Sequence, residues 1–166
     1  MFRYSIFKTA LGYLGLVVSP KGIHMVILPR KSEAEVKVEM GKHYTEDLVR
    51  DEEGLSSLRR KFVDYFSGKK VIFKEKLDVI GATPFELKVW DVVYGIPHGE
   101  TRSYDWVAKQ VGSPKKVRAV GQALKHNRLP IVIPCHRVIC KSGDLGGFSG
   151  GVDLKRKLLK LEGRIW

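Results

Sequence analysis

The change from strand patterns to helix patterns along the chain constrains its fold more than any other sequence feature. Residues 2–28 contain three short runs rich in β-branched and aromatic residues, with glycine and proline turns between them. Such runs predict an antiparallel meander of short strands. Ser32 followed by Glu35 resembles a helix capping box, and apolar residues three or four positions apart predict a helix over 55–68. A further strand is expected at 70–74.

The second half of the chain carries helix signals instead. A threonine cap followed by proline predicts a helix over 83–94, and further helices are expected over 103–112, 113–127 and 152–163. The second and third of these helices meet across a short turn, which is the spacing of a helix-turn-helix. The second helix of such a pair enters a DNA groove, but any corner between two helices in a bundle has a similar pattern.

These patterns together predict an α+β protein made of two parts. Residues 1–77 would form a small N-terminal strand-rich domain with a helix, and residues 78–166 a mainly helical C-terminal domain with the helix-turn-helix. No run of about 18 apolar residues occurs, so no membrane-spanning helix is expected. The first residues lack a signal-peptide pattern. We therefore expect a cytoplasmic protein, nuclear in a eukaryotic cell, that acts as a monomer.

Positive charge is concentrated in the second half of the chain. The net charge is +12, and residues 102–141 carry nine lysines or arginines against one acid, whereas residues 1–77 carry fifteen against ten. Such a local excess attracts a polyanion and speeds the encounter with it. The alternative is a solvated basic face without a partner.

The sequence Pro134-Cys135-His136-Arg137 follows an apolar run and is the strongest candidate for a reactive site. An imidazole near a thiol can stabilise the thiolate, which is the nucleophilic form. Three alternatives stay open at this point. Cys135 could be a buried structural thiol, could bind zinc together with His136 and Cys140, or could serve a cysteine protease with a distant histidine. The zinc alternative lacks paired ligand spacing, and no protease signature surrounds the thiol.

Four stretches of the second half occur in a recognisable order: "TRSYDWVAKQVGSPKKVRAVGQALKHN", "NRLPIVIPCHRVI", "GGFSGG" and "LLKLEG". In order and spacing, residues 83–163 resemble the O6-alkylguanine-DNA alkyltransferases, the methylated-DNA protein cysteine methyltransferases. The resemblance implies direct DNA repair, in which an alkyl group moves irreversibly from O6 of guanine to the protein's own cysteine. It also implies double-stranded DNA bound through the minor groove and no metal or nucleotide cofactor. Repair of O4-alkylthymine is left open.

The resemblance also assigns roles to five residues of the site. Cys135 would be the acceptor thiol, linked through a water to His136, with Glu162 behind the imidazole. Tyr104 would donate a hydrogen bond to the guanine ring at N3. Asn127, the single asparagine of the chain, would tie the recognition helix to the reactive segment.

The remaining candidates concern DNA and the base pocket. By resemblance, Arg118 would fill the space left by a base rotated out of the duplex. The DNA-contacting candidates are Arg118, Ala119, Ala123, Lys115, Lys116, Arg128 and Arg137, and the pocket candidates are Val138, Phe148, Ser149 and Gly150. Arg128 and Phe148 depart from the proline and tyrosine of many family members. The competing hypothesis is a non-catalytic helix-turn-helix module or alkylated-base sensor, which would not need a reactive thiol.

Overall fold

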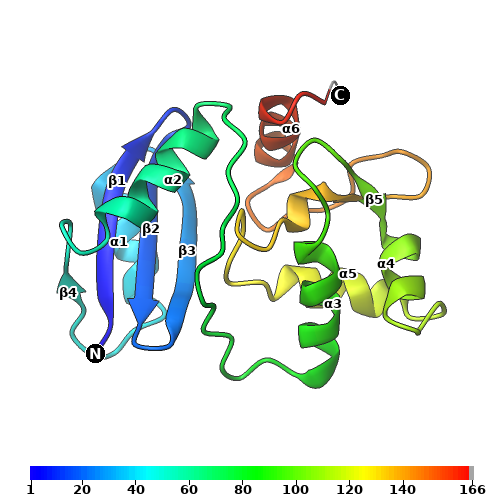
Figure 1. Cartoon of the computed structure of the whole chain (residues 1–166), viewed down its shortest axis with the longest axis horizontal. Helices are drawn as coiled ribbons and strands as arrows, with labels where there is room; N and C mark the ends of the chain where they lie inside the picture. The colour runs from blue at the N-terminus through cyan, green and yellow to red at the C-terminus, as the bar shows by residue number, and fades with distance from the viewer. Residues whose placement is uncertain (165–166) are drawn as a thin grey trace. The chain divides into compact units, whose positions relative to one another are not determined.

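The protein, described as a computed structural model over residues 1–164, consists of two compact units (Figure 1). The first unit is Met1–Asp78 and the second is Val79–Trp166. The first is a sheet with helices and the second is mainly helical, so the predicted α+β class is confirmed. Asp78 belongs to the first unit because its amide donates to the Ile23 carbonyl at 2.8 Å and its carboxylate accepts from Ser19 at 2.6 Å.

The first unit is built on a four-stranded sheet in the order β3-β2-β1-β4. The strands β1 (Arg3–Thr9), β2 (Gly12–Ser19) and β3 (Gly22–Arg30) form the antiparallel meander that their alternating patterns and turns predict. The edge strand β4 (Val49–Arg50) pairs parallel to β1 over two residues. It is too short to produce a sequence pattern, and it was not predicted.

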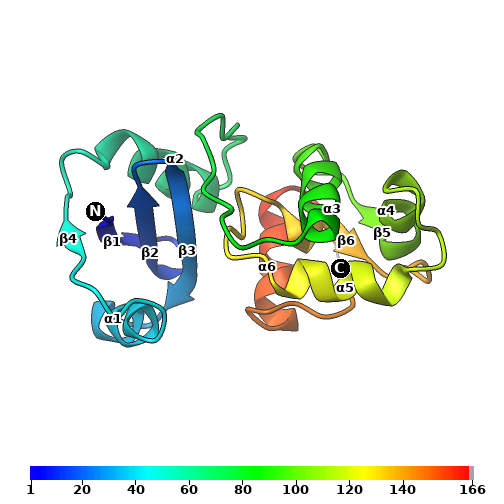
Figure 2. The same cartoon turned by 90° about the horizontal axis from the view of Figure 1, so that it is seen from below.

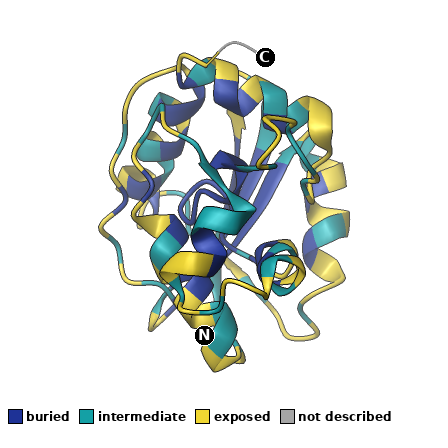
Figure 3. Cartoon of the chain, turned by 90° about the vertical axis from the view of Figure 1, so that its right-hand side faces the viewer, coloured by how far each residue is buried: buried dark blue, intermediate teal, exposed yellow. Residues whose placement is uncertain are grey.

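Two helices flank this sheet. Helix α1 (Glu33–Gly41) begins at Ser32, whose hydroxyl accepts from the Glu35 amide at 3.2 Å, and helix α2 (Ser56–Phe66) covers the predicted stretch. Buried side chains of β1, β2, β3 and α1 form one core cluster of the unit: Ile6, Val17, Met25, Ile27, Val36 and Met40. Figure 3 shows buried residues along the strands, and buried, intermediate and exposed residues alternating along the helices.

The prediction of a strand at 70–74 is wrong. No strand is assigned there, and Ile72 is 63% exposed. The pairing with the sheet occurs later, where the Ile23 amide donates to the Lys76 carbonyl at 2.9 Å beside an isolated parallel bridge to Leu77. An apolar pattern alone does not show which residues of a segment reach the neighbouring strand.

The second unit contains four helices among its described residues: α3 (Pro84–Tyr94), α4 (Tyr104–Gln110), α5 (Val117–Lys125) and α6 (Val152–Leu161). A complete capping box at Thr83 begins α3, which confirms that prediction. Over residues 1–164, no helix is long and apolar enough to cross a membrane.

Helix α5 begins later than predicted. The sequence favoured a start at Ser113, but the Lys116 amide donates to the Ser113 carbonyl at 2.9 Å and closes a separate turn before Val117. The helix-turn-helix pair of α4 and α5 is therefore present with a shorter second helix.

A two-residue parallel ladder connects this helix pair to the reactive segment. Strand β5 (Arg102–Ser103) pairs with β6 (Val138–Ile139), and a short 3-10 turn η1 (Cys135–Arg137) directly precedes β6. Figure 2 shows β5 beside β6, next to α4. Since Tyr104 follows β5 directly, the ladder holds the start of α4 beside the cysteine segment.

Candidate active site

Cys135 opens onto a cavity of about 430 Å³ in the second unit. The thiol residue is only 6% exposed, but it lines the cavity wall together with residues of α4, α5 and the glycine loop after β6. Cavities of this volume accommodate small organic ligands. The lining residues are Tyr104, Gly121, Leu124, Lys125, Cys135, Cys140, Gly146, Gly147, Phe148 and Ser149. Cys135 is therefore not sealed in an apolar interior.

The segment before the thiol is a compact turn rather than a strand. The Cys135 amide donates to the Ile133 carbonyl at 2.7 Å, and Ile131 adopts a φ of 75° while being 2% exposed. A positive φ is strained for a β-branched side chain. Asn127 secures this turn, because its Nδ2 donates to the Ile133 carbonyl and its Oδ1 accepts from the Leu129 amide, both at 2.9 Å.

Two opposing effects act on the proton of Cys135. Burial raises the pKa of the thiol, because the thiolate loses solvation in the interior. A hydrogen bond from Asn127, the positive charge of Lys155 and backbone amides act in the opposite direction and lower the pKa. Burial is the larger effect, so the pKa of Cys135 is raised overall, and these groups limit the rise in favour of the thiolate, the nucleophilic form.

Behind the thiol, His136 and Glu162 form a buried pair. Both side chains are fully buried, and Nε2 of His136 hydrogen-bonds Oε2 of Glu162. Burial lowers the pKa of His136, although Glu162 opposes this shift. Burial acts to raise the pKa of Glu162, but the hydrogen bond from His136 and the charges of His136 and Arg137 lower it to about 2. A neutral imidazole that donates from Nε2 presents Nδ1 as its acceptor.

Arg137 lies inside the protein, which corrects its assignment as a DNA contact. Arg137 is 8% exposed. Its Nε donates to the Glu162 carboxylate at 2.6 Å, and its Nη1 donates to the Ile96 carbonyl at 2.7 Å. The guanidinium therefore fixes the Glu162 carboxylate and cannot reach a phosphate from this position. Its cationic side chain does bind an anion, but this anion is the internal Glu162 carboxylate and not a phosphate of DNA.

Tyr104 and Gly146 lie against each other in the cavity wall. A Cβ atom placed on Gly146 would lie 3.0 Å from the hydroxyl oxygen of Tyr104 and 3.2 Å from Sγ of Cys140. Burial raises the pKa of Tyr104 to about 12, with smaller effects from the negative charges of Cys140 and Cys135. The phenol keeps its proton at neutral pH and can act as a hydrogen-bond donor.

The remaining pocket candidates lie along the glycine loop and β6. Phe148 and Ser149 line the cavity, and Gly150 is exposed one residue beyond them. The Val138 side chain is fully buried, and its carbonyl accepts from Nζ of Lys155 at 2.7 Å. A carbonyl has two lone pairs, so this one can accept a second hydrogen bond.

Most DNA-contacting candidates lie on the surface of α5 and its neighbours. Lys115 and Arg118 are exposed, and Ala119 is partly exposed. Lys116 is exposed with its ammonium 5.6 Å from the centre of the Phe85 ring. Arg128 is partly exposed and donates to the Ile80 carbonyl at 2.7 Å.

Ala123 is the exception on this helix. It is 2% exposed, and its carbonyl accepts from the Trp90 indole at 2.8 Å, so it packs against α3. Its assignment as a DNA contact is therefore corrected. Small size alone suggested a close approach to DNA, but the helix places this alanine on its inner side.

The sequence analysis missed several lining and supporting residues. Gly121, Leu124 and Lys125 line the cavity from α5, and Cys140 lines it from the loop. Helical spacing from Arg118 could have indicated Gly121 and Lys125, which follow at i+3 and i+7. Lys155 was also missed, and its contacts are described below. Within residues 1–164, no group of three histidine, cysteine or acidic side chains could hold a metal ion.

Comparisons with known proteins agree on one family. Residues 84–164 match the family described as 6-O-methylguanine DNA methyltransferase, DNA binding domain, and residues 2–79 match its ribonuclease-like domain. A methylated-DNA–protein-cysteine methyltransferase of Methanosarcina acetivorans is 38% identical over 161 residues, covering 96% of this chain and 97% of the relative. The constitutive enzyme of that name from Bacillus subtilis is 38% identical over 165 residues, covering 98% and 96%. The crystal structure of Mycobacterium tuberculosis OGT in complex with DNA is similar with a TM-score of 0.79 at 36% identity, covering 96% of this chain and 92% of that one.

Proposed function

The chain belongs to the methylated-DNA–protein-cysteine methyltransferases, which are DNA-repair alkyltransferases, and on that premise we propose that Cys135 is its acceptor thiol. The substrate is guanine alkylated at O6 in duplex DNA. The observation that carries the proposal is the position of Cys135 in the wall of a cavity of about 430 Å³, with the buried His136–Glu162 pair behind it.

The reaction is a displacement at an sp³ carbon. The Cys135 thiolate forms a carbon–sulfur bond, the carbon–O6 bond breaks, and the guanine takes up one proton as its oxygen leaves. His136, with Nε2 committed to Glu162, can take the thiol proton through Nδ1 by way of a water. Tyr104 supplies the hydrogen bond that meets charge developing on the base. A thioether is a very poor leaving group, so each molecule reacts once.

DNA is the macromolecular partner. We place the minor groove of the duplex along the exposed side of α5, with Arg118 filling the space of the extruded base. One side of α5 carries the exposed Arg118 and two residues that line the cavity, Gly121 and Lys125. The helix can therefore contact the duplex while the extruded base occupies the cavity. The minor groove carries little sequence information, which suits a protein that must act at any guanine. The excess of positive charge in residues 102–141 supports phosphate binding.

Mass spectrometry after incubation with a methylated duplex tests the proposal. One methyl group should appear on Cys135, and Cys135→Ala should remain unmodified while still binding the duplex. The matched variant Cys140→Ala removes the second thiol of the cavity and should still be methylated at Cys135. Methyl transfer to Cys140 would move the acceptor, and lesion binding by an unmodified wild-type protein would favour the sensor hypothesis.

A further inference from the structure

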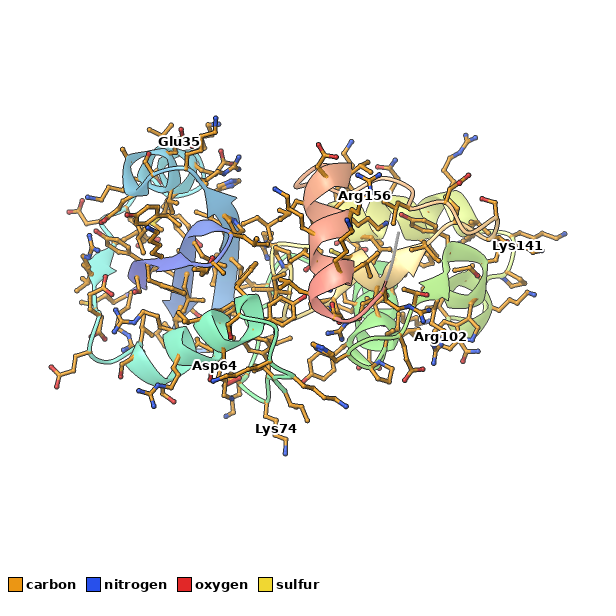
Figure 4. All side chains as sticks on the ribbon, turned by 90° about the horizontal axis from the view of Figure 1, so that it is seen from above. Glu35, Asp64, Lys74, Arg102, Lys141 and Arg156 are labelled. Carbon is orange, nitrogen blue, oxygen red and sulfur yellow. The ribbon has the colours of Figure 1, made fainter. Side chains whose placement is uncertain are left out.

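Lys155 is a buried lysine of α6 whose contacts the proposed reaction does not use. Lys155 is 0% exposed. Its Nζ donates to three carbonyls, those of Val138 at 2.7 Å, Gly147 at 3.1 Å, and Leu145. An ammonium group has three hydrogens, so all its donors are satisfied. Arg156, the next residue, instead carries its charge at the surface of α6 (Figure 4) and pairs with Asp153 at 3.1 Å.

No carboxylate of residues 1–164 serves as a counter-ion to the charge of Lys155. Within the described residues 1–164, no aspartate or glutamate forms an ion pair with it. Buried charges are strongly disfavoured unless an opposite charge or a metal compensates them. Burial lowers the pKa of this ammonium from 10.5 to about 8, and two thiols, Cys135 and Cys140, oppose that shift. The ammonium is therefore still charged at neutral pH.

The same ammonium connects three parts of the pocket. Val138 follows the reactive turn, whereas Leu145 and Gly147 belong to the glycine loop that forms the opposite part of the wall. The ammonium also lies 5.7 Å from the centre of the Tyr104 ring. Its three hydrogen bonds thus hold the loop against the segment that carries Cys135.

We propose that Lys155 is a positioning residue: its ammonium is the counter-ion of the Cys135 thiolate, and its hydrogen bonds hold the glycine loop as the pocket wall. This inference rests on the proposed function, in which Cys135 reacts as a thiolate. It predicts that the thiolate is stabilised by the charge of Lys155 on α6 as well as by the hydrogen bond from Asn127. The acidity of the thiol then depends on Lys155 even when no DNA is present.

Other titratable or charged groups also surround Cys135, so the test must isolate Lys155 from them. They are Tyr104 on α4, Lys125 on α5, Cys140 after β6, His136 and Arg137 on η1, and Glu162 at the end of α6. Cys140 is replaced by alanine in every protein compared, so that Cys135 is the only thiol that can react, and the other groups stay unchanged. The control variant is Lys157→Met, at an exposed position of the same helix.

The first measurement is the rate of alkylation of Cys135 by iodoacetamide as a function of pH. An opposite charge close to a titratable group commonly shifts its pKa by about one to three units. Lys155→Met should therefore raise the apparent pKa by at least about one unit and slow alkylation at pH 7 about tenfold. Lys155→Arg, which keeps the charge, should restore most of the rate, and Lys157→Met should match the background. An unchanged pH profile in Lys155→Met would overturn the proposal.

A second measurement leaves Lys155 in place and so does not depend on the folding of its variants. Nuclear magnetic resonance titration of the Lys155 ammonium should show a lower pKa in Cys135→Ser than in the wild-type protein, because serine carries no negative charge. Equal values would refute the counter-ion role. Neither measurement uses DNA. If the wild-type protein failed to accept a methyl group from DNA, the proposed function would be wrong, but the alkylation and titration results would still test the role of Lys155.

Discussion

Replacing Glu162 by glutamine removes one negative charge from a buried cluster while keeping the shape of the side chain. The carboxylate has 0% side-chain exposure and accepts from three donors: Nε2 of His136, Nε of Arg137 at 2.6 Å and the Gly99 amide at 3.2 Å. A glutamine has one oxygen, so its NH₂ group would face a donor and leave one of these groups without an acceptor. The guanidinium would then be buried without a counter-ion.

The pKa of Glu162 indicates how much free energy of unfolding the substitution should remove. The pKa of Glu162 is lowered from 4.5 to about 2, because the hydrogen bond from His136 and the nearby charges outweigh burial. A difference of about 2.5 units corresponds to about 3 kcal/mol, in the range measured for breaking buried ion pairs. Since the folded-state pKa lies below the unfolded one, this contribution is complete above pH 4.5 and is lost as the pH falls toward 2.

Unfolding by guanidinium, followed by tryptophan fluorescence, measures this effect in the second unit. Glu162→Gln should lower the free energy of unfolding by about 3 kcal/mol at pH 7 and by much less at pH 3. The control is Glu100→Gln, because Glu100 pairs with Arg102 at the surface and its removal should cost less than about 1 kcal/mol. A loss in Glu162→Gln that equals the control, or that is the same at both pH values, would refute the reasoning. Both tryptophans of the described residues, Trp90 and Trp106, belong to this unit.

Three further predictions concern the pocket, the turn and the DNA face. Gly146→Ala and Gly143→Ala both place alanine at positive φ, 73° and 96°, but only the first brings Cβ within 3.2 Å of pocket atoms. Methyl transfer in a single-turnover assay should therefore slow about tenfold or more in Gly146→Ala alone, and equal rates would contradict the pocket geometry. Asn127→Ala leaves two buried backbone groups without their partners and should lower the unfolding free energy by about 2 to 4 kcal/mol, measured by fluorescence. Arg118→Ala should slow repair of a duplex far more than reaction with free O6-benzylguanine, and similar losses on both substrates would argue against a role in base extrusion.

Local signals of the sequence predicted local structure well. The capping box at Thr83 and the hydroxyl cap at Ser103 mark the true starts of α3 and α4, because each depends on residues three positions apart. The strand expected at 70–74 is wrong because strand formation needs a partner that is distant in sequence. The predicted start of α5 is too early because the Ser113 carbonyl accepts from the Lys116 amide in a separate turn before the helix.

The site depends on burial, which a single sequence reports poorly. Cys135 stands out in the sequence as a candidate nucleophile, whereas the roles of Tyr104 and Asn127 follow only from a family resemblance, and all three roles stay predictions. Arg137 and Lys155 illustrate what the sequence hides: both are basic residues in basic surroundings, so both are expected in solvent. The fold instead buries them, one against a carboxylate and the other against three carbonyls.

The contacts of Glu162 also impose an order on assembly during synthesis. This residue is translated 26 positions after His136 and 63 after Gly99, yet it bonds to both. A nascent chain that has emerged only as far as α6 already carries the sulfur and the imidazole but not the carboxylate that orients the ring. The parts of the site therefore leave the ribosome separately, and the Cys135 thiol gains its complete surroundings only after the residue that follows α6 has been added.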